Sequence, residues 1–422
     1  MKGVGLMKLE KIYLENYRGL ELLQAELGGE NIVLYGINGA GKTSVLTGIS
    51  LLFSQIISQV TGNQFRQQIS ISKNDVRFRA SLARIYGNFI FEDGQALPSG
   101  FAYKKESGRR SINRDAINNF IDLFKTSYLN EDSMLPVFAY YGVNRAVLDI
   151  PLRIRQKHEF GRMEAYQNAT SSKTDFRTFF EWFRNQEDLE SERLREKRDL
   201  DYRDPVLEAT RHAIMSMLPE LSDIRVMRKP LRMCATKNNC TLRMEQLSDG
   251  EKCILAMLGD IARRLALANP NSNNPLIGGG IVLIDEIELH MHPSWQSAIV
   301  PTLHKVFPNI QFIITTHSPL VLGGLNEDFK IFGLTNQSGH IDLEEMCPGF
   351  YDANMILEDK METPSISPEV TETETKIFKY IAQQDFFAAQ DGISKLSAMT
   401  NGTHPTIAKA QILIRRGRFG SK

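Results

Sequence analysis

Short apolar runs that end in polar or glycine-rich residues recur along the chain and predict the strands of a buried sheet. Three of them are Ile32–Leu34, Ile281–Ile284 and Phe312–Thr315. Uninterrupted apolar runs bounded by turn residues are typical of strands covered on both faces, as in a parallel sheet. The segment "LPVFAYYGV" predicts a fourth core strand that ends at Tyr141. Residues 80–91 alternate instead, as a half-exposed antiparallel strand would. The expected fold class is therefore α/β, with a parallel core sheet and an antiparallel β subdomain.

Charge and proline content divide the chain further. Residues 152–204 are strongly charged with mixed signs and predict a helical arm. No heptad seam is sustained over three repeats, so a long coiled coil is not expected. A polar, proline-containing linker near the end precedes two expected helices, the last of which begins at Pro405. The predicted regions are an N-terminal lobe (1–150), a helical insertion (151–235), a C-terminal lobe (236–350), and a linker with C-terminal helices (351–422).

The overall charge gives no indication of a nucleic-acid or membrane partner. Fifty Lys and Arg residues balance fifty Asp and Glu residues, so a local patch would have to supply such a surface. The cluster around Arg225 and Arg228 is one candidate for phosphate contact. We recognise no long apolar stretch and no signal peptide, and the four cysteines lack disulfide or metal spacing. We therefore expect a cytoplasmic protein with reduced thiols and no membrane contact.

The segment after the first apolar run fits a phosphate-binding loop. Its spacing, Gly36-x-x-x-x-Gly41-Lys42-Thr43, lets backbone N–H groups turn toward phosphate oxygens at the positive end of a helix. Lys42 is expected to reach the β- and γ-phosphates, and the Thr43 hydroxyl to bind Mg²⁺. A glycine-rich turn without a ligand is the simpler alternative. We expect a nucleotide to contact Gly36, Ile37, Asn38, Gly39, Ala40, Gly41, Lys42, Thr43 and Ser44.

Two carboxylates follow the run Ile281–Ile284. Asp285 at the strand end is expected to bind Mg²⁺ together with Thr43, and Glu286 to polarise the attacking water. Unpaired carboxylates are costly at the end of a buried strand, so a purely structural role is disfavoured. His317 ends the third apolar run and is expected to contact the γ-phosphate, although a lone histidine is more often an ordinary core or surface residue.

The stretch "EQLSDGEKCILAMLGDIARRLAL" predicts another helix and its start. Ser248 is expected to cap this helix, and Glu251 completes a capping box, which needs no ligand. Leu247–Glu251 also resembles the LSGGQ signature of ABC-type ATPases, in which the signature of one subunit completes the ATP site of another. The resemblance implies that Ser248, Gly250 and Glu251 contact ATP bound by a second copy, in at least a head-to-tail dimer. Asp249 departs from the pattern, because glycine is usual there.

These motifs predict an ABC-type P-loop ATPase head, and others separate it from transporters. Asn16-Tyr17-Arg18-Gly19 resembles a turn of RecF, SMC and OLD-type ATPases, and "DEIELHMHP" resembles the OLD-like subgroup. His290 and His292 also permit a metal-binding interpretation, but no further ligands follow at zinc spacing. Pro293 is expected to begin a helix. Where ABC folds carry a glutamine after the fourth core strand, Arg145 is the candidate nucleotide contact, with an ordinary surface arginine as the alternative.

The segment after His317 lacks a D-x-D pair and is too short for the nuclease domain of OLD proteins, so no nuclease activity of the chain itself is expected. In combination, the motifs and the helical tail resemble the PtuA-type ATPases of Septu antiphage defence systems, a related version of which accompanies retrons. That resemblance implies ATP and Mg²⁺ as cofactors and control of a separate PtuB-like HNH nuclease. In the retron version, a reverse transcriptase and its DNA–RNA product (msDNA) join the complex, so a nucleic-acid partner is allowed. The alternative function is a RecF/SMC-like repair ATPase that acts on DNA ends or gaps.

Overall fold

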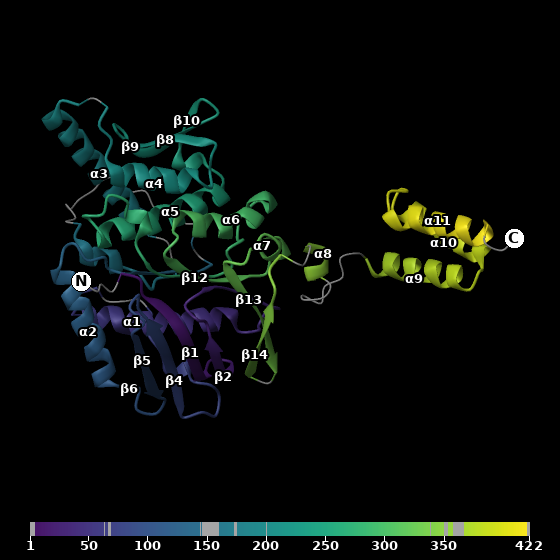
Figure 1. Ribbon diagram of the computed structural model, residues 1–422, viewed down its shortest axis with the longest axis horizontal. Helices are drawn as coiled ribbons and strands as arrows, with labels where there is room; N and C mark the ends of the chain where they lie inside the picture. Colours follow the sequence, from purple (N-terminus) through teal and green to yellow (C-terminus); the bar gives the residue numbers. More distant parts are fainter. Residues whose placement is uncertain are drawn as a thin grey trace. The chain divides into compact units, whose positions relative to one another are not determined.

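The chain forms two compact units, Met1–Ala353 and Asn354–Lys422. Their secondary structure is shown in Figure 1, which draws a computed structural model. The structure describes residues 5–62, 64–65, 69–143, 145, 160–172, 175–199, 201–337, 339–349, 353–357 and 367–419.

A mixed sheet of 11 strands forms the centre of the first unit. From one edge to the other its strands are β6 (Arg109–Ile112), β5 (Ala96–Lys104), β4 (Leu82–Ile90), β1 (Lys8–Tyr17), β2 (Leu20–Glu26), β14 (His340–Met346), β13 (Phe329–Gln337), β3 (Asn31–Tyr35), β12 (Ile310–Thr316), β11 (Gly280–Ile284) and β7 (Val137–Tyr141). The five strands from β13 to β7 are parallel. The five strands from β6 to β2 are antiparallel.

Burial along the strands follows the hydrophobic pattern. Every residue of β3, β7, β11 and β12 is buried, whereas buried positions alternate along much of β4. The parallel core and the antiparallel β subdomain expected from the sequence are thus confirmed. The parallel register pairs Ile284 with Tyr141 and with Ile314, and Thr316 with Tyr35. The residues that follow β3, β11 and β12 therefore emerge at the same edge of the sheet.

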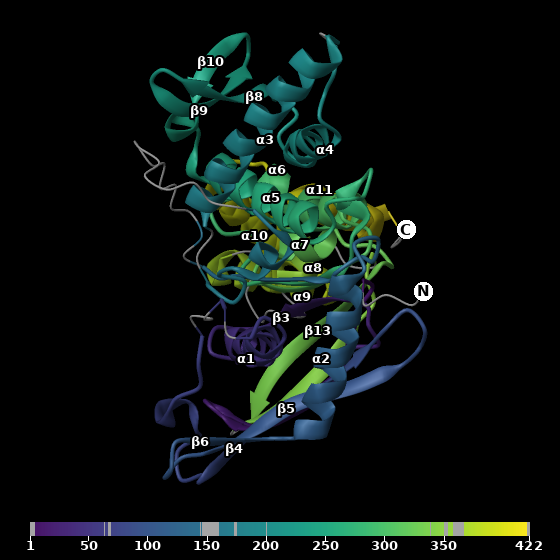
Figure 2. The ribbon, with the colours of Figure 1, turned by 90° about the vertical axis from the view of Figure 1, so that its left-hand side faces the viewer.

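Helices cover both faces of the parallel strands. In Figures 1 and 2, α1 (Lys42–Val60) lies on the opposite side of these strands from α5 (Asp249–Ala268) and α6 (Pro293–Val306). Among the described helices only α1 is long and apolar enough to cross a membrane, a feature that sequence inspection missed. However, 78% of its apolar window is buried inside the first unit, as in the core helix of a packed domain. The remaining described helices of this unit are α2 (Arg114–Leu129), α3 (Phe176–Lys197), α4 (Pro205–Met215) and α7 (Pro319–Gly323), with 3₁₀ turns η1 (Lys73–Asp75), η2 (Arg162–Tyr166), η3 (Met244–Gln246) and η4 (Pro275–Ile277). The short α8 (Ala353–Met355) includes the last residue of the first unit and the first two residues of the second.

The insertion contains a sheet that the sequence did not predict. Strands β8 (Leu221–Arg228), β9 (Leu231–Lys237) and β10 (Cys240–Arg243) form a separate antiparallel sheet beside α3 and α4 (Figure 2). Asn238 and Asn239, both at positive φ (49° and 61°), form the turn between β9 and β10. Two consecutive residues at positive φ are typical of a tight hairpin turn, so this pair was the overlooked sequence signal.

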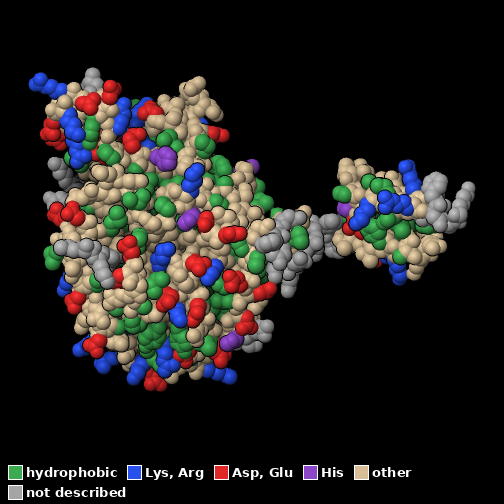
Figure 3. Space-filling model, viewed as in Figure 1, with side chains coloured by type: hydrophobic (Ala, Val, Ile, Leu, Met, Phe, Trp, Pro, Cys, Tyr) green, Lys and Arg blue, Asp and Glu red, His purple; other side chains and the backbone are tan. Residues whose placement is uncertain are grey.

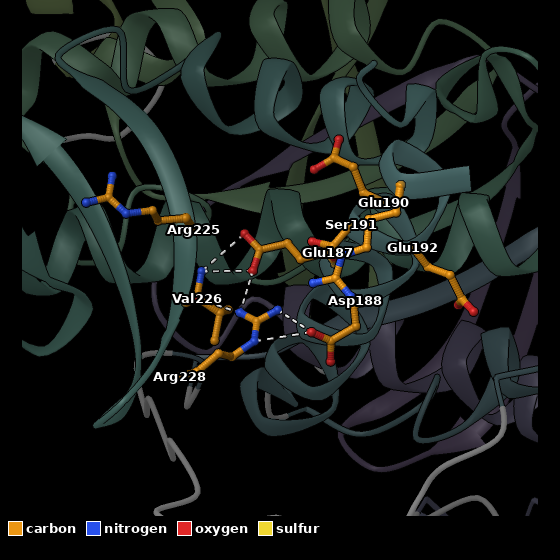
Figure 4. Close-up of a pocket in the computed structure, with 9 residues that line it drawn as sticks. Glu187, Asp188, Glu190, Ser191, Glu192, Arg225, Val226 and Arg228 are labelled. Atoms are coloured by element: carbon orange, nitrogen blue, oxygen red, sulfur yellow. Dashed lines mark hydrogen bonds and ion pairs between the residues drawn. The ribbon is translucent and has the colours of Figure 1, made fainter. Parts of the chain in front are cut away.

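Ion pairs attach this small sheet to α3. Arg228 of β8 contacts Glu187 at 2.8 Å and Asp188 at 2.5 Å, and Glu187 also accepts a hydrogen bond from the Val226 N–H (Figure 4). These groups line a pocket of about 700 Å³. Because carboxylates of α3 neutralise Arg228, the predicted basic cluster does not offer this cation freely to phosphate. In Figure 3, charges of both signs are interspersed over the visible face of the first unit.

Within the described residues 367–419, the second unit forms three helices where the sequence predicted two. They are α9 (Pro368–Ala382), α10 (Phe386–Met399) and α11 (Pro405–Phe419), the last beginning at Pro405 as expected. Helix α10 was overlooked because Gly392 lies in its interior, where glycine lowers helix propensity. A Cβ at Gly392 would lie 2.7 Å from Cγ1 of Ile377, so glycine allows α10 to approach α9 closely. The shared core comprises Val370, Ile377, Ala389, Ile393, Leu396, Ala410 and Ile414.

Candidate active site

The phosphate-binding loop connects β3 to α1. Gly36 and Gly41 have φ of 152° and 106°, a region that side-chain-bearing residues rarely adopt. A Cβ at Gly36 would lie 2.7 Å from the Leu334 carbonyl oxygen, and one at Gly41 would lie 2.9 Å from Leu20. The glycines therefore let the loop pass close to β13 and to the start of β2. Ile37, Asn38 and Gly39 are exposed at its tip, Ala40 is buried, and Ser44 is half-buried.

Lys42 is folded back into this loop. Its ammonium donates hydrogen bonds to the carbonyl oxygens of Gly36 (2.8 Å) and Ile37 (3.1 Å), and lies 3.5 Å from Nδ1 of His317. Burial lowers the pKa of Lys42 to about 8, although the nearby carboxylates of Asp285 and Glu286 favour the charged form. The structure thus places Lys42 beside His317, two residues that the sequence predicted to share one site.

Asp285 and Glu286 follow β11 and are held by the neighbouring strand. Asp285 is buried, and its Oδ1 accepts a hydrogen bond from the Thr315 hydroxyl at 2.6 Å. The Glu286 N–H donates to the same Thr315 oxygen at 2.8 Å. Glu286 has φ of 47°, a strained conformation for a residue other than glycine. One threonine therefore positions the carboxylate of Asp285 and the backbone of Glu286.

A third carboxylate, Glu288, was missed in the sequence. It accepts hydrogen bonds from the Thr316 hydroxyl at 2.8 Å and from the His317 N–H at 2.6 Å. The signal available was its place within "DEIELH", two residues after the catalytic candidate Glu286. Burial and the Lys42 cation lower the pKa of His317, so its ring is neutral near pH 7.

Arg145 differs from the prediction, because it is neither a surface residue nor open to a nucleotide. Its side chain is completely buried. Its guanidinium donates hydrogen bonds to the carbonyl oxygens of Asp285 (2.5 Å), Glu286 (2.5 Å) and Ile287 (3.1 Å), and others to Gly142 and to the Cys253 thiol. With its donors committed to protein atoms, Arg145 positions the Asp285–Ile287 backbone and does not reach a ligand. Sequence alone cannot reveal this role, since it depends on three carbonyls facing one buried cation.

The signature residues form a second cluster. Ser248 caps α5, and its hydroxyl and N–H both contact Glu251, which confirms the capping box. Glu251 also pairs with Lys237 of β9 at 2.7 Å. A Cβ at Gly250 would lie 2.5 Å from the His290 carbonyl oxygen, so this glycine packs directly against the segment that follows Glu286. Within the described residues, no hydrogen bond or ion pair joins this cluster to the phosphate-binding loop.

The two histidines and Asp249 have ordinary surroundings. The His292 ring accepts a hydrogen bond from the Ser294 N–H and caps α6, which begins at Pro293 as expected. His290 is exposed at positive φ. No group of three metal-binding side chains occurs among the residues that the structure describes. Asp249 is exposed and pairs with Lys252 at 3.1 Å, which offsets its charge at the start of α5.

The donors at the strand ends fit a hydrated Mg²⁺ ion. Thr43 and Asp285 line one cavity and supply a hydroxyl and a carboxylate, the hard oxygen ligands that Mg²⁺ prefers. Lys42 provides a cation for phosphate oxygens, and the N-terminus of α1 provides backbone N–H groups. The fold and this arrangement of groups define an ABC-type P-loop ATPase.

Comparison with known proteins identifies the family. The model described as "AAA domain, putative AbiEii toxin, Type IV TA system" matches residues 32–323. The "Retron Ec83 probable ATPase" of Escherichia coli is 34% identical over 383 residues, which cover 75% of this chain and 70% of that protein. The "Septu protein PtuA" of Bacillus mycoides (strain KBAB4) is 25% identical over 352 residues, which cover 81% of this chain and 42% of that protein. The chain belongs to this AAA family and, within it, to the PtuA-type ATPases of antiphage defence systems.

A solved structure agrees with the fold. The Smc head domain with an extended coiled coil, bound to the C-terminal domain of ScpA and derived from Pyrococcus furiosus, superposes with a TM-score of 0.50 at 12% sequence identity. The match covers 81% of this chain and 96% of that chain. At this identity the likeness concerns the fold alone, and it agrees with the ABC-type head inferred from the motifs.

Proposed function

We propose that this chain binds and hydrolyses ATP with Mg²⁺, and that its ATP state controls a partner HNH nuclease in an antiphage defence complex. The proposed binding and hydrolysis of ATP rest on one observation: Lys42, Asp285 and His317 come together at the ends of adjacent parallel strands. Lys42 and His317 lie 3.5 Å apart, and Asp285 is close enough to favour the charged form of Lys42. A buried cation and a neutral imidazole can contact phosphate oxygens, and the carboxylates beside them can bind a metal ion.

Each side chain has a defined task in this proposal. The Lys42 ammonium leaves the carbonyls of Gly36 and Ile37 and binds β- and γ-phosphate oxygens. Glu286 orients a water molecule and accepts its proton while the water oxygen bonds to the γ-phosphorus and the bond to the bridging β–γ oxygen breaks. The neutral His317 donates a hydrogen bond to the γ-phosphate. Mg²⁺ bound through Thr43 and Asp285 would neutralise charge on the phosphates.

The proposed active unit is a head-to-tail dimer with two ATP sites. Glu251 forms an ion pair with Lys237, and Gly250 packs against the backbone of His290. Within the described part of one chain, no hydrogen bond or ion pair joins these signature residues to the phosphate-binding loop. We therefore infer that the signature residues of a second copy would contact the γ-phosphate. The start of α5 supplies backbone N–H groups and a positive dipole end for that contact.

The defence role rests on the relatives, one of which is named as a probable retron ATPase and another as a Septu protein. By analogy, a PtuB-like HNH nuclease would cut nucleic acid while this chain would not, and both would act in the cytoplasm. In a retron setting, a reverse transcriptase and its DNA–RNA product would hold the complex inactive. ATP occupancy of the dimer would restrain the nuclease, and hydrolysis would release it.

Co-expression with the HNH partner tests this control. Cells carrying wild-type protein should resist phage, whereas cells carrying Glu286→Gln should lose protection because the dimer stays ATP-bound and the nuclease stays restrained. Glu327→Gln removes the same charge from an exposed position and serves as the matched control. Equal resistance of Glu286→Gln and wild-type cells would refute control by hydrolysis.

A further inference from the structure

A cavity of about 380 Å³ adjoins the two predicted Mg²⁺ ligands. It is lined by Thr43 and Asp285 and also by the hydroxyl-bearing segment Thr170–Ser172, which precedes α3. Tyr140 of β7 lines it as well, and burial raises the pKa of its phenol, which therefore remains a hydrogen-bond donor. The mechanism above assigns no task to Thr170–Ser172.

The end of β7 holds this segment in place. The Tyr140 N–H donates to the Ala169 carbonyl oxygen at 2.8 Å, and the Gly142 N–H donates to that of Ser172 at 3.0 Å. A Cβ at Gly142 would lie 2.7 Å from Cβ of Ser172, so the glycine permits direct contact with the serine. The Asp285 N–H donates to Tyr141 in the same strand at 2.8 Å. Ser172 and Asp285 are therefore positioned by two consecutive residues, Gly142 and Tyr141, at the end of β7.

A buried network joins the segment to the signature helix. Arg264 of α5 donates to the carbonyl oxygens of Ala165 (2.6 Å) and Gln167 (3.0 Å), just before the segment. Its guanidinium also pairs with Asp260 at 2.8 Å, and the Tyr141 hydroxyl donates to the same carboxylate at 2.8 Å. Helix α5, which Ser248 caps, is thus connected to both sides of the cavity wall.

We propose that the cavity is a water-binding site on the open side of the catalytic metal, in which the Ser172 hydroxyl positions water bound to Mg²⁺. This inference rests on the proposed ATPase function. Mg²⁺ in nucleotide sites usually keeps several of its waters, because it binds few protein ligands and loses water reluctantly. An ordered water needs two to four polar partners, and the cavity supplies neutral hydroxyls beside Thr43 and Asp285. Through Arg264, closure of a second copy on α5 would act on this water shell.

The test measures metal binding directly. In full-length protein with a non-hydrolysable ATP analogue, Mn²⁺ affinity is determined by electron paramagnetic resonance titration. Ser172→Ala should weaken Mn²⁺ binding by about tenfold, as is typical when an outer-shell partner of a metal site is lost. Ser172→Thr keeps a hydroxyl and should restore most of the affinity. Gly142→Ala, which displaces Ser172, should behave like Ser172→Ala.

Ser191→Ala is the matched control, since the Ser191 hydroxyl bonds to the Glu187 carbonyl oxygen on α3 and does not line this cavity. Wild-type Mn²⁺ affinity in both Ser172→Ala and Gly142→Ala would overturn the water site. If Lys42→Ala and Glu286→Gln strongly lower ATP hydrolysis in the same preparations, the ATPase function stands even though the water site fails. If those two variants hydrolyse ATP normally, the proposed function itself fails.

Discussion

The Thr315 hydroxyl bonds to both motif carboxylate residues at once, donating to Oδ1 of Asp285 at 2.6 Å and accepting from the Glu286 N–H at 2.8 Å. The parallel register places Ile284 opposite Ile314, so Thr315 follows directly beside Asp285. The bond to Glu286 helps to offset its strained φ of 47°. One side chain on β12 therefore fixes the proposed metal ligand and the backbone of the proposed base relative to each other.

Thr315→Val keeps the shape of the side chain and removes both bonds. A buried polar group left without its partner costs about 1–3 kcal/mol, so we expect kcat to fall about 10- to 100-fold and the melting temperature to fall. Steady-state hydrolysis and thermal unfolding measure the two effects. Thr210→Val is the control, because that buried hydroxyl bonds to the Val206 carbonyl oxygen on α4. Unchanged kcat in Thr315→Val would remove this threonine from the mechanism.

Arg145→Met is expected to act through the backbone of Asp285–Ile287. Three carbonyl oxygens would lose their donor, at about 1–3 kcal/mol for each group left unsatisfied. Thermal stability and kcat should fall together, while the affinity for ATP changes little in the protein that remains folded. Arg145→Lys should rescue poorly, because a lysine cannot reproduce the planar fork of donors. A stable variant with selectively weakened ATP binding would restore the nucleotide-contact role.

The pKa of Lys42 predicts how ATP affinity depends on pH. Burial lowers this pKa to about 8, and bound phosphate oxygens would raise it again. Below about pH 8 the ammonium is already protonated, so affinity should be level. Above that value each ATP must bind together with a proton, and affinity should fall by up to about tenfold per pH unit. Titration with a fluorescent ATP analogue at values from pH 7 to 9.5 measures this pH dependence. Lys42→Ala should bind ATP weakly, and its affinity should not fall with pH in the same way.

The limits of sequence prediction are clear from particular residues. The phosphate-binding loop was predictable because its glycines meet local steric demands at fixed spacing, and the core strands because they are apolar throughout. Thr315 and Arg145 were not recognised as positioning residues, since their partners come from other strands and depend on register. The sheet β8–β10 was missed because its short strands lie in a region dominated by charge, where Glu187 and Arg228 neutralise each other.

A mixture of two inactive variants tests the proposed dimer. Ser248→Arg should spare ATP binding by its own loop and block hydrolysis across the interface, whereas Lys42→Ala should fail to bind ATP. A mixed dimer contains one site with an intact loop and an intact signature, so mixing should restore part of the activity. Because Ser248 also caps α5, thermal unfolding must show that Ser248→Arg remains folded. Full activity of Ser248→Arg as a monomer would contradict the arrangement.

The central claim is that Glu286 acts as the general base in ATP hydrolysis. Its most direct test measures two properties of purified Glu286→Gln: the rate of ATP hydrolysis and the fraction of sites that hold Mg²⁺ and ATP. The amide keeps the size of the side chain but cannot accept the proton of the water. Hydrolysis should therefore fall by about 10²- to 10⁴-fold, the range expected for loss of a general base. ATP and Mg²⁺ should remain bound, since Lys42, Thr43 and Asp285 are unchanged. Hydrolysis at the wild-type rate would contradict the account of the active site.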